Sequence, residues 1–331
     1  MRPALEKTLR EVFEGEGGRM TAAGQGSITK LRSAELGVSN LAQSLKFYTG
    51  TWGLQQVASA DGAVYLRATG AEHHILVLRE QAEPALLGAS FVASSRAVVD
   101  RLHSTLGARG VPHAAPSDLP ALAGGGYGLV VNTPDGLPVT ISSDVTQHAP
   151  IDDPSKPVCL THVVFNTTDL AAQQFFFEQC LGFRVSDTTA AMVFMRCGTD
   201  HHSIAIAHGR HASVNHLSFE MRDFDGLMYG GGRLIGAGRT LEWGVGRHGP
   251  GANIFAYFLD PDGFAVEYTT EMQQVDGATH EAQTAEYWTS FPMRPCRWGM
   301  ARKPSPAMIR AFGGDLLTRP QGIFGGMPAN R

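Results

Sequence analysis

The chain is poor in cysteine: only four occur among 331 residues, and no two of them form a C-x-x-C pair. A zinc ribbon needs closely spaced cysteine pairs, and a disulfide-stapled secreted domain needs a dense cysteine framework. The sequence excludes both, so we expect reduced thiols and a cytoplasmic protein. The four cysteines are Cys159, Cys180, Cys197 and Cys296.

Charge is scarce as well, at 18% of the residues with a formal net charge of −4. This balance predicts neither a nucleic-acid partner nor an anionic membrane partner. No apolar run reaches the roughly 18 residues of a membrane span, and residues 1–30 lack the apolar core of a secretory signal. We expect residues 1–30 to be a leader, in which a short amphipathic helix precedes a glycine-rich linker.

Glycine and proline are abundant, at 39 and 18 residues, which predicts many short turns in a strand-rich fold. The length suffices for two domains with separate cores. The sequence also repeats itself once. We expect a first module at 31–145, a second module at 157–272, and a tail at 273–331 that folds over the active site. The matching segments are 36–54 with 162–183, 64–78 with 193–207, and 133–140 with 260–267.

Each module is predicted to contain two units of strand, helix and three short strands, which gives an α+β fold. The dipeptide D-G at 262–263 and G-P-G at 249–251 are typical of turns between such strands. In the second module, the hydrophobic pattern predicts helices at 169–180 and 223–236. It predicts strands at 158–166, 184–187, 191–197, 202–208, 213–221, 239–243, 253–259 and 263–270.

Three polar side chains of the second module lie on predicted strands. They are His162 in L-T-H-V-V-F-N, His216 in N-H-L-S-F-E-M and Glu267 in D-P-D-G-F-A-V-E-Y. Strand alternation places His216 and Glu267 on the polar faces of their strands. Two imidazoles and one carboxylate leave coordination positions open on a metal, and this ligand set is typical of non-haem Fe(II) oxygen chemistry.

The repeat supplies an internal control for this prediction. Sequence alignment of the two modules puts Leu36 opposite His162, Ala89 opposite His216 and Thr140 opposite Glu267. The first module therefore folds without these ligand types, so the fold alone does not require them. We expect metal in the second module only.

Several spaced motifs of the second module agree with one known family. They are D-H-H-S at 200–203, G-R-H-G-P-G at 246–251 and D-P-D-G-F-A-V-E at 260–267. Paired βαβββ units with this D-P-D-G ending resemble the vicinal oxygen chelate superfamily, in which such modules form open, incomplete barrels. More narrowly, residues 31–300 resemble the two-domain type I extradiol ring-cleaving dioxygenases.

This resemblance implies an activity and a cofactor. It assigns Fe(II) to His162, His216 and Glu267, and Mn(II) accepts the same ligands. The substrate would be a catechol, opened by O2 next to its hydroxyls to a yellow 2-hydroxymuconic-semialdehyde-type product in aromatic-compound catabolism. The resemblance also implies a homo-oligomer.

The resemblance further assigns roles around the metal. His202 would be the acid–base residue, and His248 and Tyr257 would form hydrogen bonds to the substrate and to the reacting oxygen. Because neighbouring residues on a strand face opposite ways, we expect His201 to face solvent. The first module carries a similar pair, His73 and His74, without a metal site. The histidine pair is therefore partly a structural feature that both modules share.

The candidate substrate contacts come from one position where this chain differs from its relatives and from the tail. Relatives that take acidic catechols carry an arginine five residues before the position of His248, where this chain has Trp243. An apolar substituent is therefore expected to stack on Trp243. Arg247, Arg297 and Trp298 are further candidates, and an arginine of the tail would keep acidic catechols possible.

Two other functions stay open. A glyoxalase-type isomerase or epimerase usually needs a fourth protein ligand, and Glu220, on the same strand face as His216, is the residue that could supply it. A non-catalytic binding protein of the same superfamily is the second alternative. It would have no use for the three ligands together with His202, His248 and Tyr257.

Overall fold

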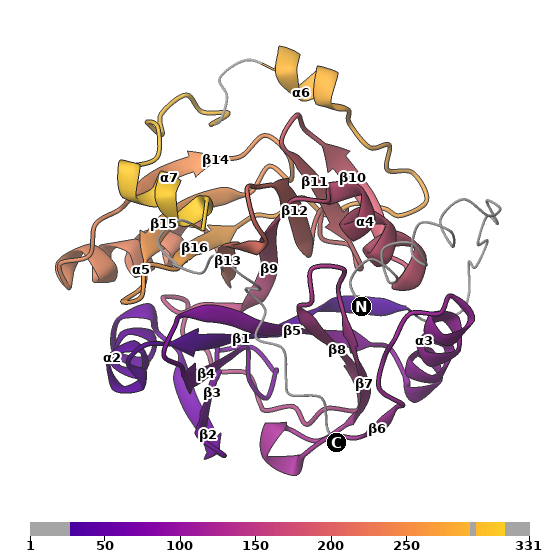
Figure 1. Cartoon of the computed structure of the whole chain (residues 1–331). Coiled ribbons are helices and arrows are strands. Elements are labelled where there is room, and N and C mark those ends of the chain that lie inside the picture. The colour runs from indigo at the N-terminus through magenta and orange to yellow at the C-terminus, as the bar shows by residue number, and fades with distance from the viewer. Residues whose placement is uncertain (1–26, 292–295, 315–331) are drawn as a thin grey trace.

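The computed structural model describes residues 27–291 and 296–314. They form two eight-stranded mixed sheets, one per module (Figure 1). The first runs in the order β2-β3-β4-β1-β5-β8-β7-β6, and the second in the equivalent order β10-β11-β12-β9-β13-β16-β15-β14. Both sheets are open, so the predicted α+β fold of tandem modules is confirmed. Residues 1–26 of the predicted leader lie outside the described ranges, and the first strand, β1 (Ile28–Val38), begins within the last residues assigned to the leader.

The elements of the first module lie between residues 28 and 143. They are β1 (Ile28–Val38), α2 (Leu41–Lys46), η1 (Phe47–Trp52), β2 (Gln55–Ala60), β3 (Ala63–Arg67), β4 (Leu76–Glu80), β5 (Ala85–Ala93), α3 (Arg96–Ala108), β6 (Ser117–Asp118), η2 (Ala121–Ala123), β7 (Tyr127–Asn132) and β8 (Pro138–Ser143).

The second module lies between residues 157 and 270, and two short helices of the tail follow it. The elements are β9 (Pro157–Thr167), α4 (Leu170–Phe175), η3 (Phe176–Cys180), β10 (Arg184–Thr188), β11 (Met192–Arg196), β12 (Ile204–His208), β13 (Ser213–Met221), α5 (Phe224–Gly236), β14 (Trp243–Arg247), β15 (Ile254–Leu259), β16 (Ala265–Thr270), α6 (Ala285–Ser290) and α7 (Pro306–Phe312).

One strand lies elsewhere than predicted. The strand expected at 239–243 is β14, which begins only at Trp243. Its sequence W-G-V-G-R places glycine at alternate positions and contains a bulge between Gly244 and Gly246. The glycines therefore hide the period-two pattern on which the prediction depended.

Local capping explains where the helices begin. Asn40 before α2 and Asp169 before α4 hold equivalent places in the two modules. Their side chains accept hydrogen bonds from the backbone N–H groups of Gln43 (2.9 Å) and Ala172 (3.0 Å). Each satisfies an N–H that the first helical turn leaves unpaired. Both helices end in a π-helical turn, η1 and η3.

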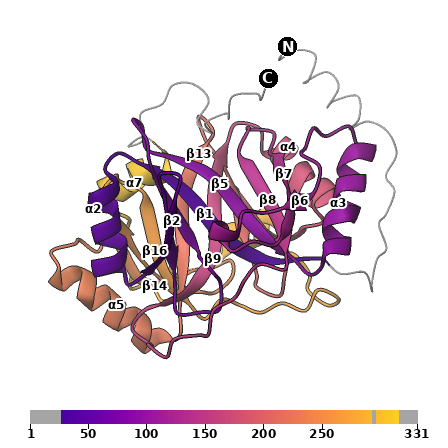
Figure 2. The ribbon, with the colours of Figure 1, turned by 90° about the horizontal axis from the view of Figure 1, so that it is seen from below.

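The two modules share one hydrophobic core. Helices α2 and α5 lie on one side of the molecule, and α3 and α4 lie on the other (Figure 2). Trp52 of η1 is fully buried and stacks on Tyr268 of the second sheet at a ring distance of 3.9 Å. The hydroxyl of Tyr48 donates a 2.9 Å hydrogen bond to Asp260 of the D-P-D-G turn. The second sheet is thus held in place by the first module.

No helix within the described ranges is long and apolar enough to cross a membrane. All four cysteines are free, and two of them, Cys180 and Cys296, are buried.

A buried histidine of the first module makes the stability of the fold depend on pH. Burial, with Arg32 as a second cause, lowers the pKa of His74 to about 2. An unfolded imidazole titrates near about 6.5. Below that pH the unfolded chain takes up a proton that the folded chain excludes, so stability falls as the pH falls from about 6.5 toward 2.

We expect His74→Gln to reduce this pH dependence. Relative to the variant, the wild-type protein should lose about 2 kcal/mol of its free energy of unfolding between about pH 7 and 5. Urea unfolding followed by tryptophan fluorescence at the two pH values measures the difference. Equal losses in both proteins would contradict the assignment.

Candidate metal centre and active site

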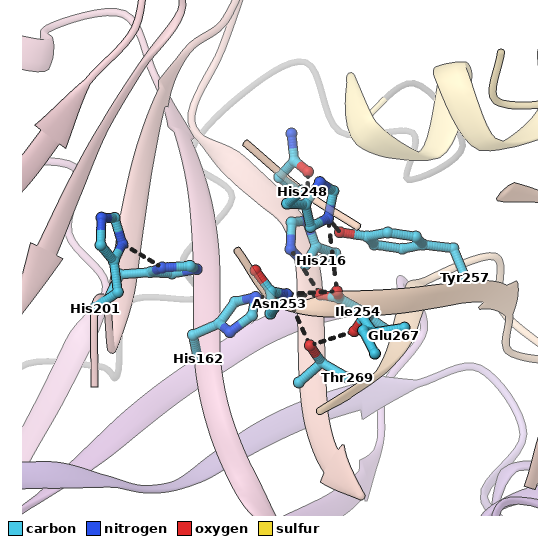
Figure 3. Close-up of polar contacts among 11 residues, drawn as sticks. His162, His201, His216, His248, Asn253, Ile254, Tyr257, Glu267 and Thr269 are labelled. Carbon is cyan, nitrogen blue, oxygen red and sulfur yellow. Dashed lines mark hydrogen bonds and ion pairs between the residues drawn. The ribbon is translucent and has the colours of Figure 1, made fainter. Parts of the chain in front are cut away.

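The three predicted ligands come together at the middle of the second sheet (Figure 3). They lie on the neighbouring strands β9, β13 and β16, where Ser218 pairs with His162 on one side and with Glu267 on the other. Oε2 of Glu267 lies 3.1 Å from Nε2 of His162 and 3.5 Å from Nε2 of His216. All three side chains are buried, with 0–7% exposure.

The donor set fits a divalent cation. Oε2 of Glu267 is buried and accepts no hydrogen bond from any described residue, although two imidazole nitrogens face it. Lone pairs that converge without a proton between them are what a shared metal ion requires. Nδ1 of His216 lies 2.8 Å from Oδ1 of Asn215, a contact that orients the imidazole and leaves Nε2 for the metal. These side chains form a His/His/Glu metal site.

The electrostatics hold the ligands in their metal-binding protonation states. Burial lowers the pKa of His216 to about 3, against the opposing charge of Glu267. Burial alone would raise the pKa of Glu267, but the imidazoles of His162, His248 and His216 close to the carboxylate hold it below its usual range. At neutral pH the His216 imidazole is neutral and the carboxylate is ionised, as metal coordination demands.

Strand registers identify the counterparts of these ligands in the first module. Ser33 pairs with Ser90, which in turn pairs with Thr140. This repeats the pairing of His162, Ser218 and Glu267. The counterparts are therefore Ser33 for His162 and Gly88 for His216, where the sequence alignment put Leu36 and Ala89. Bulges and loop insertions between the modules shift the alignment. Thr140 is the counterpart of Glu267, as predicted, and no metal ligand occupies any of the three positions.

A cavity of about 520 Å³ opens above the metal ligands. His162 and His216 line it together with the predicted residues His202, His248 and Tyr257. Its remaining walls are largely apolar and include Val164, Met192, Phe194, Trp243, Trp288 and Phe312. The described part of the tail contributes two of these walls through α6 and α7.

Three polar side chains surround the open side of the metal site. The ring of His202 lies 4.4 Å from that of His162. Burial, followed by the neighbouring imidazoles, lowers the pKa of His202 well below its usual value. Nε2 of His248 and the hydroxyl of Tyr257 lie 3.1 Å apart, and burial raises the pKa of Tyr257. His202 is therefore neutral at pH 7, and Tyr257 keeps its proton.

The four predicted substrate contacts divide into two pairs. Trp243 and Arg297 line the cavity. Arg247 and Trp298 are not among its lining residues: Arg247 donates to the carbonyl of Ala252 (2.7 Å) and pairs with Glu271. The guanidinium of Arg247 stacks over the ring of Trp298, which is 39% exposed.

One other prediction for this region is wrong. His201 is fully buried, although it was expected to face solvent. Residues 201–203 precede β12 instead of belonging to it, so strand alternation does not apply to His201. Glu220, the alternative left open as a fourth ligand, does not join the three metal ligands and accepts a 3.3 Å hydrogen bond from the thiol of Cys159.

Sequence reasoning missed several residues around the site. Asn253 donates to Glu267 (3.3 Å) and to the hydroxyl of Thr269 (2.7 Å), and it lines the cavity. Asn215 orients His216 as described above. Each asparagine adjoins a predicted strand or ligand, but a single asparagine in a sequence carries no signal that separates it from a turn residue.

Fold and site together define a protein of paired βαβββ modules with one divalent-metal site. The profile of the Glyoxalase/Bleomycin resistance protein/Dioxygenase superfamily matches residues 160–268. The Mn(II)-bound glyoxalase from Novosphingobium aromaticivorans is 34% identical over 91% of this chain and 97% of its own, with a TM-score of 0.79. The chain belongs to this superfamily.

Two curated relatives are dioxygenases. Metapyrocatechase 2 of Cupriavidus necator is 31% identical over 122 residues, which is 36% of this chain and 38% of the relative. An iron-dependent extradiol dioxygenase of Rhodococcus jostii is 28% identical over 133 residues, 35% of this chain and 44% of the relative. The matched regions thus span less than half the length of these two relatives. The Rhodococcus enzyme is iron-dependent, whereas the Novosphingobium glyoxalase binds Mn(II).

Proposed function

We propose that this protein is an extradiol dioxygenase, which binds Fe(II) or Mn(II) and uses O2 to open a catechol ring beside its hydroxyls. The observation that carries the proposal is the ligand set. Two histidines and one glutamate meet below an apolar cavity, and no fourth carboxylate joins them in the part of the chain that the structure describes. Such a site has room for both catechol oxygens and for dioxygen.

The residues around the metal fit the proton movements of this reaction. A bound metal supplies Lewis acidity and a path for electrons between the catechol and dioxygen. His202 is neutral, so it can accept a catechol proton and later return it. His248 and Tyr257, which lie within hydrogen-bonding distance of each other, offer polar groups to the substrate, and the apolar walls exclude water.

Isomerisation of a glyoxalase type is the second candidate. The 34% identity to a Mn(II)-bound glyoxalase over nearly the whole chain favours it. An isomerase rearranges its substrate without consuming oxygen, so oxygen consumption separates the two functions.

The experiment that tests the proposal starts from anaerobic loading with Fe(II) or Mn(II). Air is then admitted in the presence of catechol, 3- or 4-methylcatechol, 2,3-dihydroxybiphenyl or homoprotocatechuate. A yellow product with matching oxygen uptake supports ring cleavage. Absence of colour and of oxygen uptake with every substrate, with bound metal confirmed, contradicts it.

We expect Trp243→Arg to change the substrate preference. Trp243 stacks on Tyr257 in the cavity wall with ring centroids 5.1 Å apart, and it offers no partner for a carboxylate. A guanidinium there should raise kcat/KM for homoprotocatechuate relative to 3-methylcatechol by about tenfold or more. Trp298→Arg is the matched control, because Trp298 does not line the cavity. An unchanged ratio in Trp243→Arg would contradict this role.

A further inference from the structure

A buried chain of polar contacts leads away from the cavity behind His202. Nδ1 of His202 lies 3.1 Å from Nδ1 of His201. Nε2 of His201 lies at an ion-pair distance of 3.0 Å from Oδ2 of Asp187, although the two groups are not aligned as a hydrogen bond, and no described residue hydrogen-bonds to this nitrogen. All three side chains are at most 3% exposed, so water does not compete for these contacts. Figure 3 shows His201 and its contact beside His162.

The order of these groups indicates where each proton lies. A carboxylate oxygen 3.0 Å away repels the lone pair of a bare imidazole nitrogen and attracts a proton there, so the contact favours the tautomer of His201 with its proton on Nε2, which faces Asp187. Nδ1 of that tautomer is an acceptor, so the Nδ1 of His202 that faces it is the donor. The remaining nitrogen of His202, Nε2, carries a lone pair and is the one available to the cavity.

The first module shows what happens without the carboxylate. Nδ1 of His73 and Nδ1 of His74 also lie 3.1 Å apart, so the histidine pair itself belongs to the repeat. Ala58 pairs with Tyr65 as Asp187 pairs with Phe194, and a bulge precedes both residues. The counterpart of Asp187 is therefore Ala58. An acidic residue behind the histidine pair occurs in the metal-binding module and not in the other, so folding of the repeat does not require it.

Asp187 also holds the tail beside the cavity. Its Oδ2 accepts a 3.2 Å hydrogen bond from Nε1 of Trp288, a residue of α6 that lines the cavity. Its Oδ1 accepts a 2.8 Å hydrogen bond from the backbone of Gln283. Nε2 of His280, which lies near the same carboxylate, faces the carbonyl of Ser186 at 2.9 Å. Both oxygens of Asp187 thus accept hydrogen bonds from the tail.

We propose that Asp187 and His201 are positioning residues that fix the tautomer of His202, so that its Nε2 faces the cavity as a proton acceptor. The same carboxylate oxygen contacts His201 and accepts a hydrogen bond from Trp288 in the cavity wall, so one residue positions both groups. The inference rests on the proposed function in so far as His202 is the acid–base residue. The tautomer itself can be measured without turnover.

The test uses the full-length protein labelled with ¹⁵N-histidine and loaded with Zn(II), which is diamagnetic. The His202 ring signals are assigned by comparison with His202→Phe. In the wild type, we expect a protonated Nδ1 and a bare Nε2. A proton on Nε2 of wild-type His202 would overturn the proposal whatever the variants do.

Asp187→Asn should invert the tautomer. The amide can donate to Nε2 of His201, which moves the proton of His201 to Nδ1 and that of His202 to Nε2. We also expect kcat to fall about tenfold or more at unchanged metal content. This is part of the roughly 10²–10⁴-fold rate enhancement that an acid–base group contributes. Unchanged His202 signals in Asp187→Asn would contradict the proposal.

Two further variants separate positioning from packing. Trp288→Phe removes the donor to Asp187 but keeps an aromatic wall, so the His202 tautomer should persist. If it inverts, the tail controls the tautomer instead of Asp187 and His201. His73→Gln alters the pair that lacks a carboxylate and should change neither the tautomer nor kcat. Failure of the proposed function would appear as a wild-type protein without ring cleavage, whereas failure of this inference would appear in the ring signals.

Discussion

Replacing Glu267 with glutamine is expected to strip the protein of its metal. Among the residues that the structure describes, Glu267 is the only anionic ligand of the site, and it is fully buried. A neutral amide in its place leaves a divalent cation uncompensated in a low-dielectric interior. Loss of a residue that only hydrogen-bonds to a metal ligand lowers metal affinity by roughly 10–100-fold. Loss of the ligand itself should lower it further, and turnover should fall with it. Metal content after dialysis, measured by atomic absorption, checks this prediction.

Thr140→Val provides the matched control for Glu267→Gln. Thr140 occupies the same register position in the first sheet, where no ligand lies nearby. We expect this variant to keep wild-type metal content. Stoichiometric metal in Glu267→Gln would contradict the assignment of the site.

His202→Phe is expected to separate chemistry from metal binding. His202 lines the cavity and is not one of the three converging ligands. Phenylalanine keeps the volume of the ring and removes the group that accepts and returns a proton. Metal content should therefore stay at the wild-type level while kcat falls by about 10²-fold or more.

Steady-state kinetics on metal-loaded protein measure this loss, with metal content determined on the same sample. His74→Gln is the control, because His74 holds the equivalent place in the module that lacks the three ligands. It should leave kcat unchanged. Unimpaired turnover by His202→Phe would remove His202 from the mechanism.

Much of the fold was predictable because the chain contains the same unit twice. Motifs such as T-P-D-G and D-P-D-G fix equivalent turns, and long alternating strands such as β9 and β13 carry a strong period-two pattern. The prediction failed at β14, where glycines at positions 244 and 246 leave no alternation to detect. The register of the first module was also misjudged at two of three positions, since strand pairing depends on bulges that sequence alignment does not reveal.

The metal site was predictable for a related reason. His162, His216 and Glu267 stand where the other module has no ligand, so the difference between the modules marks them. Asp187 differs between the modules in the same way, but its neighbour in space is 14 residues away in sequence, at His201, across a turn that no motif marks. Its role depends on burial and on which nitrogen faces which oxygen, and neither quantity can be derived from residue order.

The most direct test of the central claim is oxygen labelling. Metal-loaded protein is allowed to turn over its best catechol substrate under ¹⁸O2, and the product is analysed by mass spectrometry before exchange with water. Ring cleavage by a dioxygenase places both labelled atoms in the product, and this is the expected result. A product that contains no label, formed without oxygen uptake, would contradict the proposal and assign the site to isomerisation.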